Sequence, residues 1–264
     1  MVQGPLPVAV MNTSVMGQSL YVSASHGSAS GAGTASRPYA TIAAVIAAAR
    51  AGASIYIAPG TYAEGSLVVN YQNMSLIGWG PPRSVIIAPA TTADALTVDA
   101  QFCQLINLDV TAGTGAARGT LIAADSVRAI GCKFETQDNV GVALEFMPSA
   151  VAGMTASLGW IEDCEFAWAG KGIRTNTVTS AVTQHTISRC LFHNCSTYSI
   201  GEDSAGTVRN LTVQDCSFGR MENGTEPTDY ITLNSGGGNT NTGMVTRCSF
   251  PTALAGGKNV VSTG

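Results

Sequence analysis

The sequence contains few charged side chains: Asp, Glu, Lys and Arg make up 11% of its 264 residues. Disorder requires high charge and low hydrophobicity, but 45% of these residues are hydrophobic, so the composition predicts a folded chain. With 13 basic residues and a net charge of −4, the sequence also lacks the basic stripe by which proteins bind nucleic acid. We therefore expect no nucleic-acid partner.

Long apolar runs are missing as well. The longest, Ile42 to Ala49, is far shorter than the roughly 18 residues of a membrane span, so we expect no membrane segment. The first ten residues, MVQGPLPVAV, have neither a basic start nor a continuous apolar core, which predicts no signal peptide.

Motifs for the common catalytic and metal sites are also absent. The seven cysteines form no CxxC pair, and an odd number favours free thiols over disulfides or zinc ligation. The sequence has no P-loop, GxSxG, HExxH or EF-hand loop and no Asp-x-Asp pair. We predict neither a cofactor nor a metal.

A repeat of the form apolar-x-x-Cys-x-Phe runs through the second half of the chain. Its cysteines are Cys132, Cys164, Cys190, Cys216 and Cys248. They are separated by 32, 26, 26 and 32 residues. Roughly two dozen residues fit one coil of three short strands, and longer intervals add loops. An earlier copy carries Leu108 and Val110 in place of Cys and Phe, and a degenerate one lies at residues 74–79.

The repeat predicts how coils stack. Like residues lie above like, so thiols and phenyl rings should form two neighbouring interior columns. The residue before each Cys should bend the strand in the left-handed conformation. A second series, Gly141-Val142, Gly172-Ile173, Ser199-Ile200 and Tyr230-Ile231, predicts another stacked wall. Cys195 lies outside the column and is expected to be the most reactive thiol.

The N-terminal part divides into an arm and a cap. Residues 1–20 form an extended arm with no coil to join, and its apolar residues are candidates for binding a partner: Val8, Val10, Met11, Val15 and Met16. The β-helix domain covers residues 21–264 and begins with a strand at residues 20–22. A helix at about residues 39–51, with Pro38 in its first turn and Arg50 in its last, should cover the open end of the stack.

The opening of the domain resembles that of a known family. The residues concerned are Thr34-x-x-x-Pro38-Tyr39-x-Thr41-Ile42, Gly52-Ala-x-Ile55-Tyr-Ile-Ala-Pro59-Gly60-Thr-Tyr62-x-Glu64 and Ser75-Leu-Ile-Gly78-x-Gly80. They are similar to the start of pectin-lyase-like right-handed parallel β-helix proteins, which include pectate lyases, pectinesterases, phage tailspikes and other virion proteins. The resemblance implies an all-β, single-stranded right-handed parallel β-helix with a short capping α-helix. It does not specify an activity, because one fold hosts many sites.

Charged residues suitable for catalysis are sparse. Asp163, Arg189, Asp215 and Arg247 occupy the bend position in successive copies and should pair as an exposed ladder. Lys133 and Glu165 also lie one coil apart, and we expect them to pair in the same way. If the protein is an enzyme, the remaining candidates for acid-base catalysis are Glu202, Asp203 and His193.

Three functions remain open. The first is a structural virion protein, a phage capsid decoration or cement protein that binds the major capsid protein or another virion protein, self-associates as a homotrimer and resides on the particle surface. The second is a tailspike-type appendage that binds a glycan. The third is a polysaccharide lyase or hydrolase, which the missing catalytic motifs make the least favoured.

Overall fold

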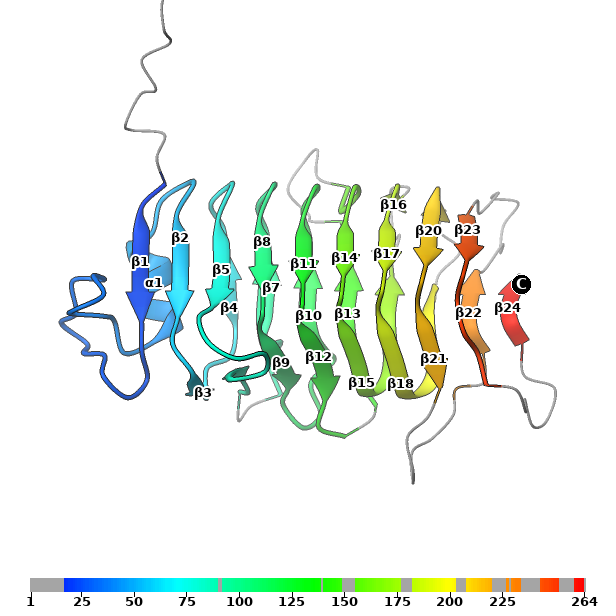
Figure 1. Cartoon of the computed structure of the whole chain (residues 1–264), viewed down its shortest axis with the longest axis horizontal. Helices are drawn as coiled ribbons and strands as arrows, with labels where there is room; N and C mark the ends of the chain where they lie inside the picture. The colour runs from blue at the N-terminus through cyan, green and yellow to red at the C-terminus, as the bar shows by residue number, and fades with distance from the viewer. Residues whose placement is uncertain are drawn as a thin grey trace, which may run out of the picture.

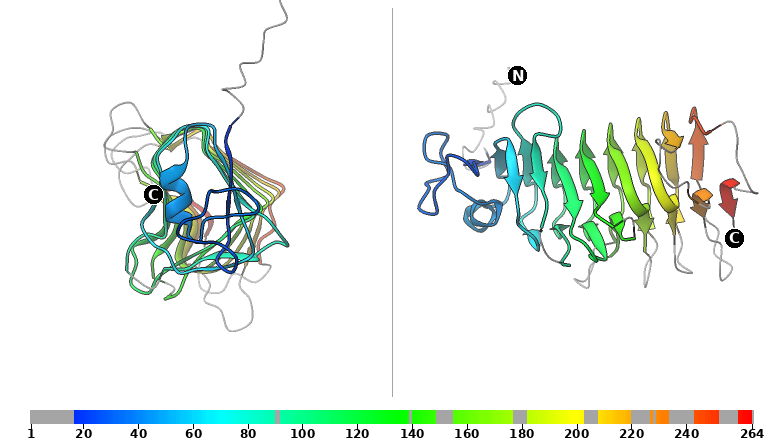
Figure 2. Two further views of the ribbon diagram at one scale, coloured as in Figure 1. Left: turned by 90° about the vertical axis from the view of Figure 1, so that its left-hand side faces the viewer. Right: turned by 90° about the horizontal axis from the view of Figure 1, so that it is seen from below.

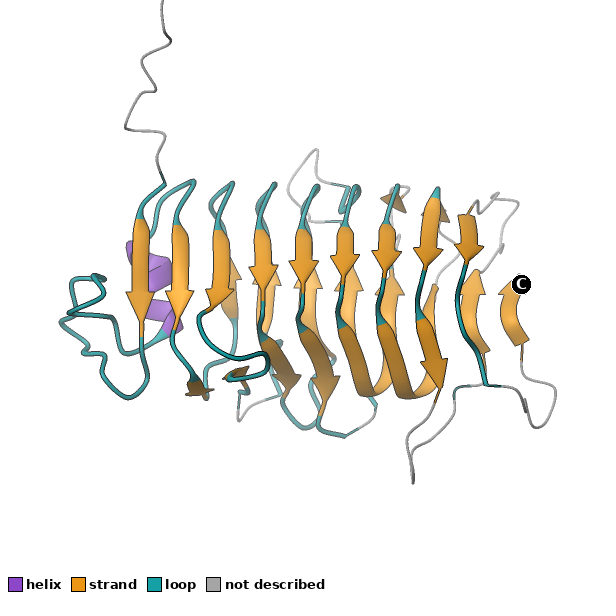
Figure 3. Cartoon of the chain, viewed as in Figure 1, coloured by secondary structure: helices purple, strands orange, loops and turns teal. Residues whose placement is uncertain are grey.

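The chain folds into a stack of parallel strands that coils around one axis (Figure 1). The computed structural model describes residues 17–89, 92–138, 140–148, 155–176, 182–202, 208–219, 227, 229–233, 243–251 and 259–263. Consecutive strands of a coil lie in different walls, and each pairs in parallel with the equivalent strand one coil away. The prediction of an all-β, right-handed parallel β-helix is confirmed (Figure 3).

The stack has three walls. The first contains β1 (Ser19–Val22), β2 (Ser54–Ile57), β5 (Ser75–Gly78), β8 (Gln104–Ile106), β11 (Arg128–Ile130), β14 (Trp160–Glu162), β17 (Thr186–Ser188), β20 (Leu211–Gln214) and β23 (Gly243–Thr246). The second contains β3 (Gly60–Tyr62), β6 (Val85–Ile87), β9 (Asp109–Ala112), β12 (Lys133–Thr136), the first half of β15 (Glu165–Thr175), the first half of β18 (Leu191–Glu202) and β21 (Ser217–Gly219). The third contains β4 (Leu67–Val69), β7 (Leu96–Val98), β10 (Arg118–Ile122), β13 (Val142–Phe146), the remainder of β15 and β18, β22 (Asp229–Leu233) and β24 (Asn259–Thr263). A separate two-stranded pair joins β16 (Val182–Thr183) and β19 (Val208–Arg209).

Alternation along each strand builds the core. In β5, Leu76 is fully buried while its neighbours Ser75 and Ile77 are half-buried on the outer face. Leu76 lies in register with Ile55 of β2 and Leu105 of β8, so apolar residues stack from coil to coil. A single coil cannot bury its apolar face alone, and stacking supplies the missing cover.

The corner between the first and second walls has the same structure in each Cys-containing copy. The residue before each Cys has a φ of 51° to 62°, in the left-handed region: Gly131, Asp163, Arg189, Asp215 and Arg247. The predicted left-handed bend is therefore confirmed. Arg adopts it although its Cβ makes this conformation unfavourable, because the pairing on both sides of the corner fixes the turn.

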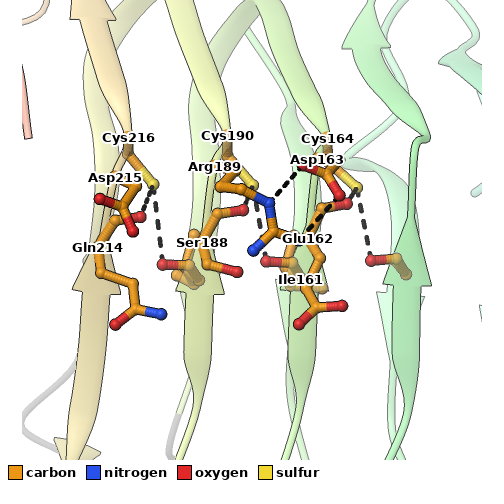
Figure 4. A network of polar contacts seen from close by, with 12 residues as sticks. Ile161, Glu162, Asp163, Cys164, Ser188, Arg189, Cys190, Gln214, Asp215 and Cys216 are labelled. Carbon is orange, nitrogen blue, oxygen red and sulfur yellow. Dashed lines mark hydrogen bonds and ion pairs between the residues drawn. The ribbon is translucent and has the colours of Figure 1, made fainter.

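The thiol at each corner lies against two backbone carbonyl oxygens (Figure 4). Cys164 Sγ is 3.2 Å from the Glu162 oxygen of its own coil and 3.6 Å from the Ala129 oxygen of the preceding coil. Equivalent contacts recur at Cys132, Cys190, Cys216 and Cys248. A weak, compact donor suits this corner, since each thiol can donate to a carbonyl there without enlarging the coil.

The phenyl rings form the adjacent column. Successive ring centroids lie 4.8–5.3 Å apart with interplanar angles of 5–21° along the series Phe134, Phe166, Phe192, Phe218 and Phe250. Burying one Phe contributes roughly 1.5–3 kcal/mol, and stacking of the rings adds to this. The column therefore fixes the register of the coils as well as filling the core.

In the middle of the stack, the second and third walls are joined by continuous strands. β15 and β18 pass from one wall to the other at bends where Trp168 and Asn194 have φ values of 48° and 56°. The register also corrects the second predicted series. Ile173 pairs with Ile200 as expected, but its partner in β13 is Leu144 rather than Val142, a slip of two residues that keeps the same face.

The N-terminal end of the stack is covered by α1 (Ile42–Ala48), which lies across it in Figure 2 and contacts β1, β2 and β4. Its buried residues are Ile42, Val45 and Ile46, the apolar face that the sequence predicts. The predicted extent of 39–51 is wrong at both ends: Pro38 precedes the helix, and Ala49 is already extended. Arg50 therefore lies beyond the last turn.

Helix α1 begins at residue 42 because two side chains take up its free amides. Thr41 Oγ1 accepts from the Ala44 amide at 3.2 Å. The Glu64 carboxylate, which follows β3, accepts from the amides of Ile42 and Ala43 at 2.7 and 2.8 Å. A carboxylate at a helix N-terminus also interacts favourably with the helix dipole. Glu64 thus joins the cap to the first complete coil.

The predicted arm falls mostly on residues 1–16, which lie outside the described residues, as do its candidate contacts Val8, Val10, Met11, Val15 and Met16. Its predicted boundary at residue 20 is late, because β1 begins at Ser19 and pairs with β2 over its whole length.

We expect Ile46→Asp to destabilise the cap by about 3 kcal/mol or more, because it places an unpaired carboxylate in the buried face of α1. Ala47→Asp is the matched control: it adds the same charge at an exposed position of the helix and should cost no more than about 1 kcal/mol. Urea unfolding followed by circular dichroism measures both. Equal stability of the two variants would show that α1 does not cap the stack.

We expect the native protein to be almost inert to thiol reagents. Cys195, which the sequence singled out as the most reactive thiol, is instead fully buried, and burial raises its pKa to about 12. Cys248 is the least buried of the seven and should react first. Titration with a thiol reagent before and after denaturation checks this, and three or more fast-reacting groups in the native state would contradict the buried column.

Candidate functional site

A polar cluster lies on the outer face of the second wall, where several charged side chains are withdrawn from solvent. One outward column contains Asp109, Lys133 and Glu165 in register on β9, β12 and β15. The neighbouring outward column contains Thr111 on β9, Glu135 on β12 and His193 on β18, with Ala167 of β15 between the last two. We call these six residues, together with Arg83, the Arg83 cluster.

Arg83 reaches this wall from the loop between β5 and β6, which crosses the lower part of the stack in Figure 1. Its guanidinium pairs with Glu165 Oε2. The backbone of Arg83 has a φ of 65°, a conformation that costs a non-glycine residue about 1 kcal/mol or more. The loop backbone thus has an unfavourable conformation at Arg83, the residue whose guanidinium binds the cluster.

Glu165 is the centre of the cluster. Its Oε1 lies 3.1 Å from His193 Nε2, while its other oxygen takes the Arg83 guanidinium. Both side chains are nearly buried, with 11% of the Glu165 side chain and 4% of the His193 side chain exposed. Burial lowers the pKa of His193, and the nearby Lys133 and Arg83 lower it further. The imidazole is therefore neutral near pH 7 and donates its Nε2 proton to Glu165.

The remaining residues form a second half of the cluster. Thr111 Oγ1 donates to Glu135 Oε1 at 2.9 Å, and Lys133 Nζ pairs with Glu135 Oε2. Burial raises the pKa of the Asp109 carboxyl, and the Lys133 ammonium partly offsets this. The expected ladder between Lys133 and Glu165 is wrong, since Glu135 on its own strand and Arg83 from the loop supply closer partners.

This arrangement has part of the geometry of an acid-base site. Glu165 orients a neutral imidazole, whose Nδ1 is buried and has no partner among the described residues. A raised carboxyl pKa at Asp109 adds a candidate proton donor on the same wall. Every other carboxylate of the cluster, however, is held by a cation or a hydroxyl, which limits its availability for proton transfer.

The charged residues at the bends between the first and second walls are paired as well. Arg189 binds Asp163 through two contacts of 2.7 and 2.9 Å, and Arg247 binds Asp215 in the same way at 2.6 and 2.7 Å. The predicted pairing of bend residues one coil apart is therefore confirmed, and Figure 4 shows the first of these pairs.

On the third wall, the fully buried carboxylate of Glu145 is neutralised by two guanidinium groups. Arg118 Nη1 lies 3.1 Å from Glu145 Oε2, and Arg174 Nη2 lies 2.8 Å from Oε1. Asn176 donates to Oε1 at 2.9 Å. This pairing satisfies a charge that burial would otherwise make very unfavourable.

The structure separates His193 from Glu202, two members of the predicted trio of Glu202, Asp203 and His193. His193 lies in the second wall against Glu165, whereas Glu202 is the last residue of β18, in register with Thr175 of the third wall. The bend at Asn194 lies between them. Asp203 lies outside the described residues.

Sequence reasoning did not identify Arg83 as a member of the cluster. Nothing in the repeat shows that this loop residue contacts a strand three positions further along the wall. The one available signal was the isolated cation next to an otherwise uncharged strand, residues 85–87.

The outer face of the first wall differs from the other faces in having almost no charge. Among the nine strands of this wall, the charged outward residues are Arg128 and Glu162, and they pair with each other. Side chains on five successive strands form a half-buried apolar row: Tyr21, Tyr56, Ile77, Ile106 and Ile130. We call this face the uncharged wall.

Neither metal-binding groups nor membrane-spanning helices emerge from the described residues. No three His, Cys, Asp or Glu side chains in them converge as metal ligands. No helix within them is both long and apolar enough to cross a membrane.

Several solved structures have the same parallel β-helix fold as this chain. Escherichia coli ybhC has a TM-score of 0.57 and 12% identity, over 92% of this chain and 74% of that one. Pectate lyase Pel9A has a TM-score of 0.55 and 12% identity, over 94% and 77%. The fold is that of the pectin-lyase-like parallel β-helices. The pectin methylesterase of Aspergillus niger is also similar, with a TM-score of 0.50 and 16% identity over 87% of this chain and 84% of that one.

Sequence comparison adds a short match. A family described as "Protein of unknown function (DUF1565)" matches residues 25–67, which contain the capping helix, β2 and β3. No curated protein sequence matches the chain. Identities of 12–16% support the shared β-helix and nothing finer, so function must be argued from the surface.

We expect Arg83→Ala to destabilise the protein by about 1–3 kcal/mol, because it leaves the nearly buried Glu165 without its cation. Arg189→Ala removes the cation of an exposed pair and should have no measurable effect on stability. Chemical unfolding of both variants provides the comparison. If both variants have the same free energy of unfolding as the parent, Arg83 does not stabilise the cluster.

Proposed function

We propose that this β-helix is a structural protein of a virus particle, a decoration or cement protein of a phage capsid that attaches to the assembled shell without catalysis. The uncharged wall is the observation that carries the proposal. A face whose two charged residues pair with each other, and which has a row of apolar side chains, suits contact with protein, because docking requires little desolvation of charge.

The paired charges elsewhere support the same function. Glu145, Asp163, Asp215 and Glu165 each have a guanidinium partner, as expected where carboxylates stabilise a surface rather than transfer protons. Such pairing leaves few groups free to act on a substrate.

The partners in this proposal are the major capsid protein or another virion protein, and further copies of the chain in a homotrimer on the particle surface. Three flat walls allow one wall to contact another copy while a second faces the shell. The apolar arm that precedes β1, which contains Val8, Val10, Met11, Val15 and Met16, would add to the attachment because its apolar residues gain cover by docking.

The test introduces charge into the uncharged wall. Ile77→Lys combined with Ile106→Lys should reduce co-sedimentation with assembled capsid shells by about tenfold or more, since each change buries an ammonium at the contact. Thr97→Lys, at the half-buried middle position of β7 on the third wall, is the control and should bind like the parent. Undiminished binding of the double variant, with its melting temperature unchanged, would remove the basis of the proposal.

A glycan-binding or glycan-cleaving β-helix is the second candidate, as an appendage of tailspike type or as a polysaccharide lyase or hydrolase. The observation that favours it is the Arg83 cluster, where Glu165 orients a neutral His193 and burial raises the pKa of the Asp109 carboxyl on the same wall. Depolymerisation of a polysaccharide that is lost in both His193→Ala and Asp109→Asn would establish it. Dependence on Glu202 without His193 would point to a different site.

A further inference from the structure

A hollow of about 200 Å³ opens at the start of the first wall, where the loop of residues 23–38 meets the outer face. Three aromatic rings line it, from Tyr21, Tyr56 and Trp79, together with Ser23, His26 and Pro38. This aromatic hollow lies on the first wall, and the Arg83 cluster lies on the second.

The three rings form a corner. Tyr21 and Tyr56 stack with ring centroids 5.2 Å apart and an interplanar angle of 20°. Trp79 meets Tyr21 nearly edge-on, at 6.0 Å and 61°. Residues from three successive coils thus create two apolar surfaces at a steep angle, each with ring atoms available for contact.

Trp79 is held in place and yet exposed. It follows β5 directly, and its amide donates to the Ile57 carbonyl oxygen at 2.7 Å. Its side chain is nevertheless 60% exposed, more than either of the other two tryptophans, Trp160 and Trp168. A fixed backbone that presents a large ring to solvent is typical of a binding anchor, because little entropy is lost when a ligand covers it.

The lining determines which ligand fits. None of its residues is Asp, Glu, Lys or Arg, so the lining offers no ion-pair partner to a charged ligand. The cation–π contacts found in the described chain involve Trp160 and Tyr198, so neither Trp79 nor the two tyrosines is covered by a cation there. The exposed ring faces in the hollow can therefore pack against the apolar face of an uncharged ligand.

Polar groups at the rim complete the site. Ser25 Oγ lies 2.8 Å from His26 Nδ1, which leaves the imidazole Nε2 with no partner among the described residues. Ser23 Oγ accepts from the His26 amide at 3.1 Å and lies 3.4 Å from Ser25 Oγ, a long contact that a ligand hydroxyl can replace. Hydroxyl and imidazole groups next to aromatic faces match a pyranose ring, which has an apolar C–H face and hydroxyl groups around its edge.

We propose that the aromatic hollow binds a neutral hexopyranose unit of a glycan, with the sugar face packed on Trp79 and its hydroxyls at Ser23 and His26. The inference shares Tyr21 and Tyr56 with the uncharged wall, but it does not depend on the proposed capsid role, because sugar binding requires neither a shell nor catalysis. The hollow should bind neutral glycans more tightly than uronates, because its lining contains no Arg or Lys to pair with a carboxylate.

The test titrates the full chain with maltohexaose, cellohexaose and mannohexaose, and separately with hexagalacturonate, by saturation-transfer NMR and calorimetry. We expect saturable binding of at least one neutral oligosaccharide, and binding of hexagalacturonate at least about tenfold weaker. Trp79→Ala should weaken the neutral ligand by about tenfold or more. Trp160→Ala, which removes another exposed tryptophan of the same wall, should leave binding unchanged.

Three results would overturn the proposal: no saturable binding of any neutral oligosaccharide, hexagalacturonate binding as tightly as the neutral sugars, or an unchanged affinity in Trp79→Ala. Loss of capsid-shell binding in Trp79→Ala, without any sugar binding by the parent, would assign the hollow to a protein partner and would equally reject the sugar. Because Trp79 is exposed, circular dichroism should show the variant folded, which separates lost affinity from lost structure.

Discussion

Register between coils is the constraint on which the rest of this structure depends. Each strand pairs with its equivalents one coil away, so a side chain must fit the residues above and below it as well as its own coil. At the corner of the first and second walls, the left-handed residue, the thiol and the phenyl ring satisfy this requirement together. The outer surface is organised by the same register, which turns single residues into columns of like or complementary character.

Much of the fold follows from the sequence because the repeat records this register directly. The Cys-to-Phe spacing predicts the corner, and the alternating Asp and Arg at the bend predict their pairing, since both depend on positions that are equivalent from coil to coil. The ends of α1 were harder to predict. They depend on Glu64, a residue from outside the helix whose carboxylate fixes where the first turn begins.

The candidate sites were less predictable for a physical reason. A repeat shows which residues share a column but not which loop folds over that column, and Arg83 comes from such a loop. Glu202 and His193 were grouped as the remaining candidates for acid-base catalysis, yet the bend in β18 places them in different walls. The aromatic hollow likewise combines side chains from three coils, which no local pattern brings together.

The position of Arg83 has a consequence for how the stack comes apart. In a solenoid, each unit contacts only its neighbours, so unfolding can begin at one end and move coil by coil. Arg83 precedes β6 but binds Glu165 at the start of β15, three strands further along the second wall. This cross-link joins coils that are not neighbours, so we expect the coils between Arg83 and Glu165 to unfold together rather than one at a time.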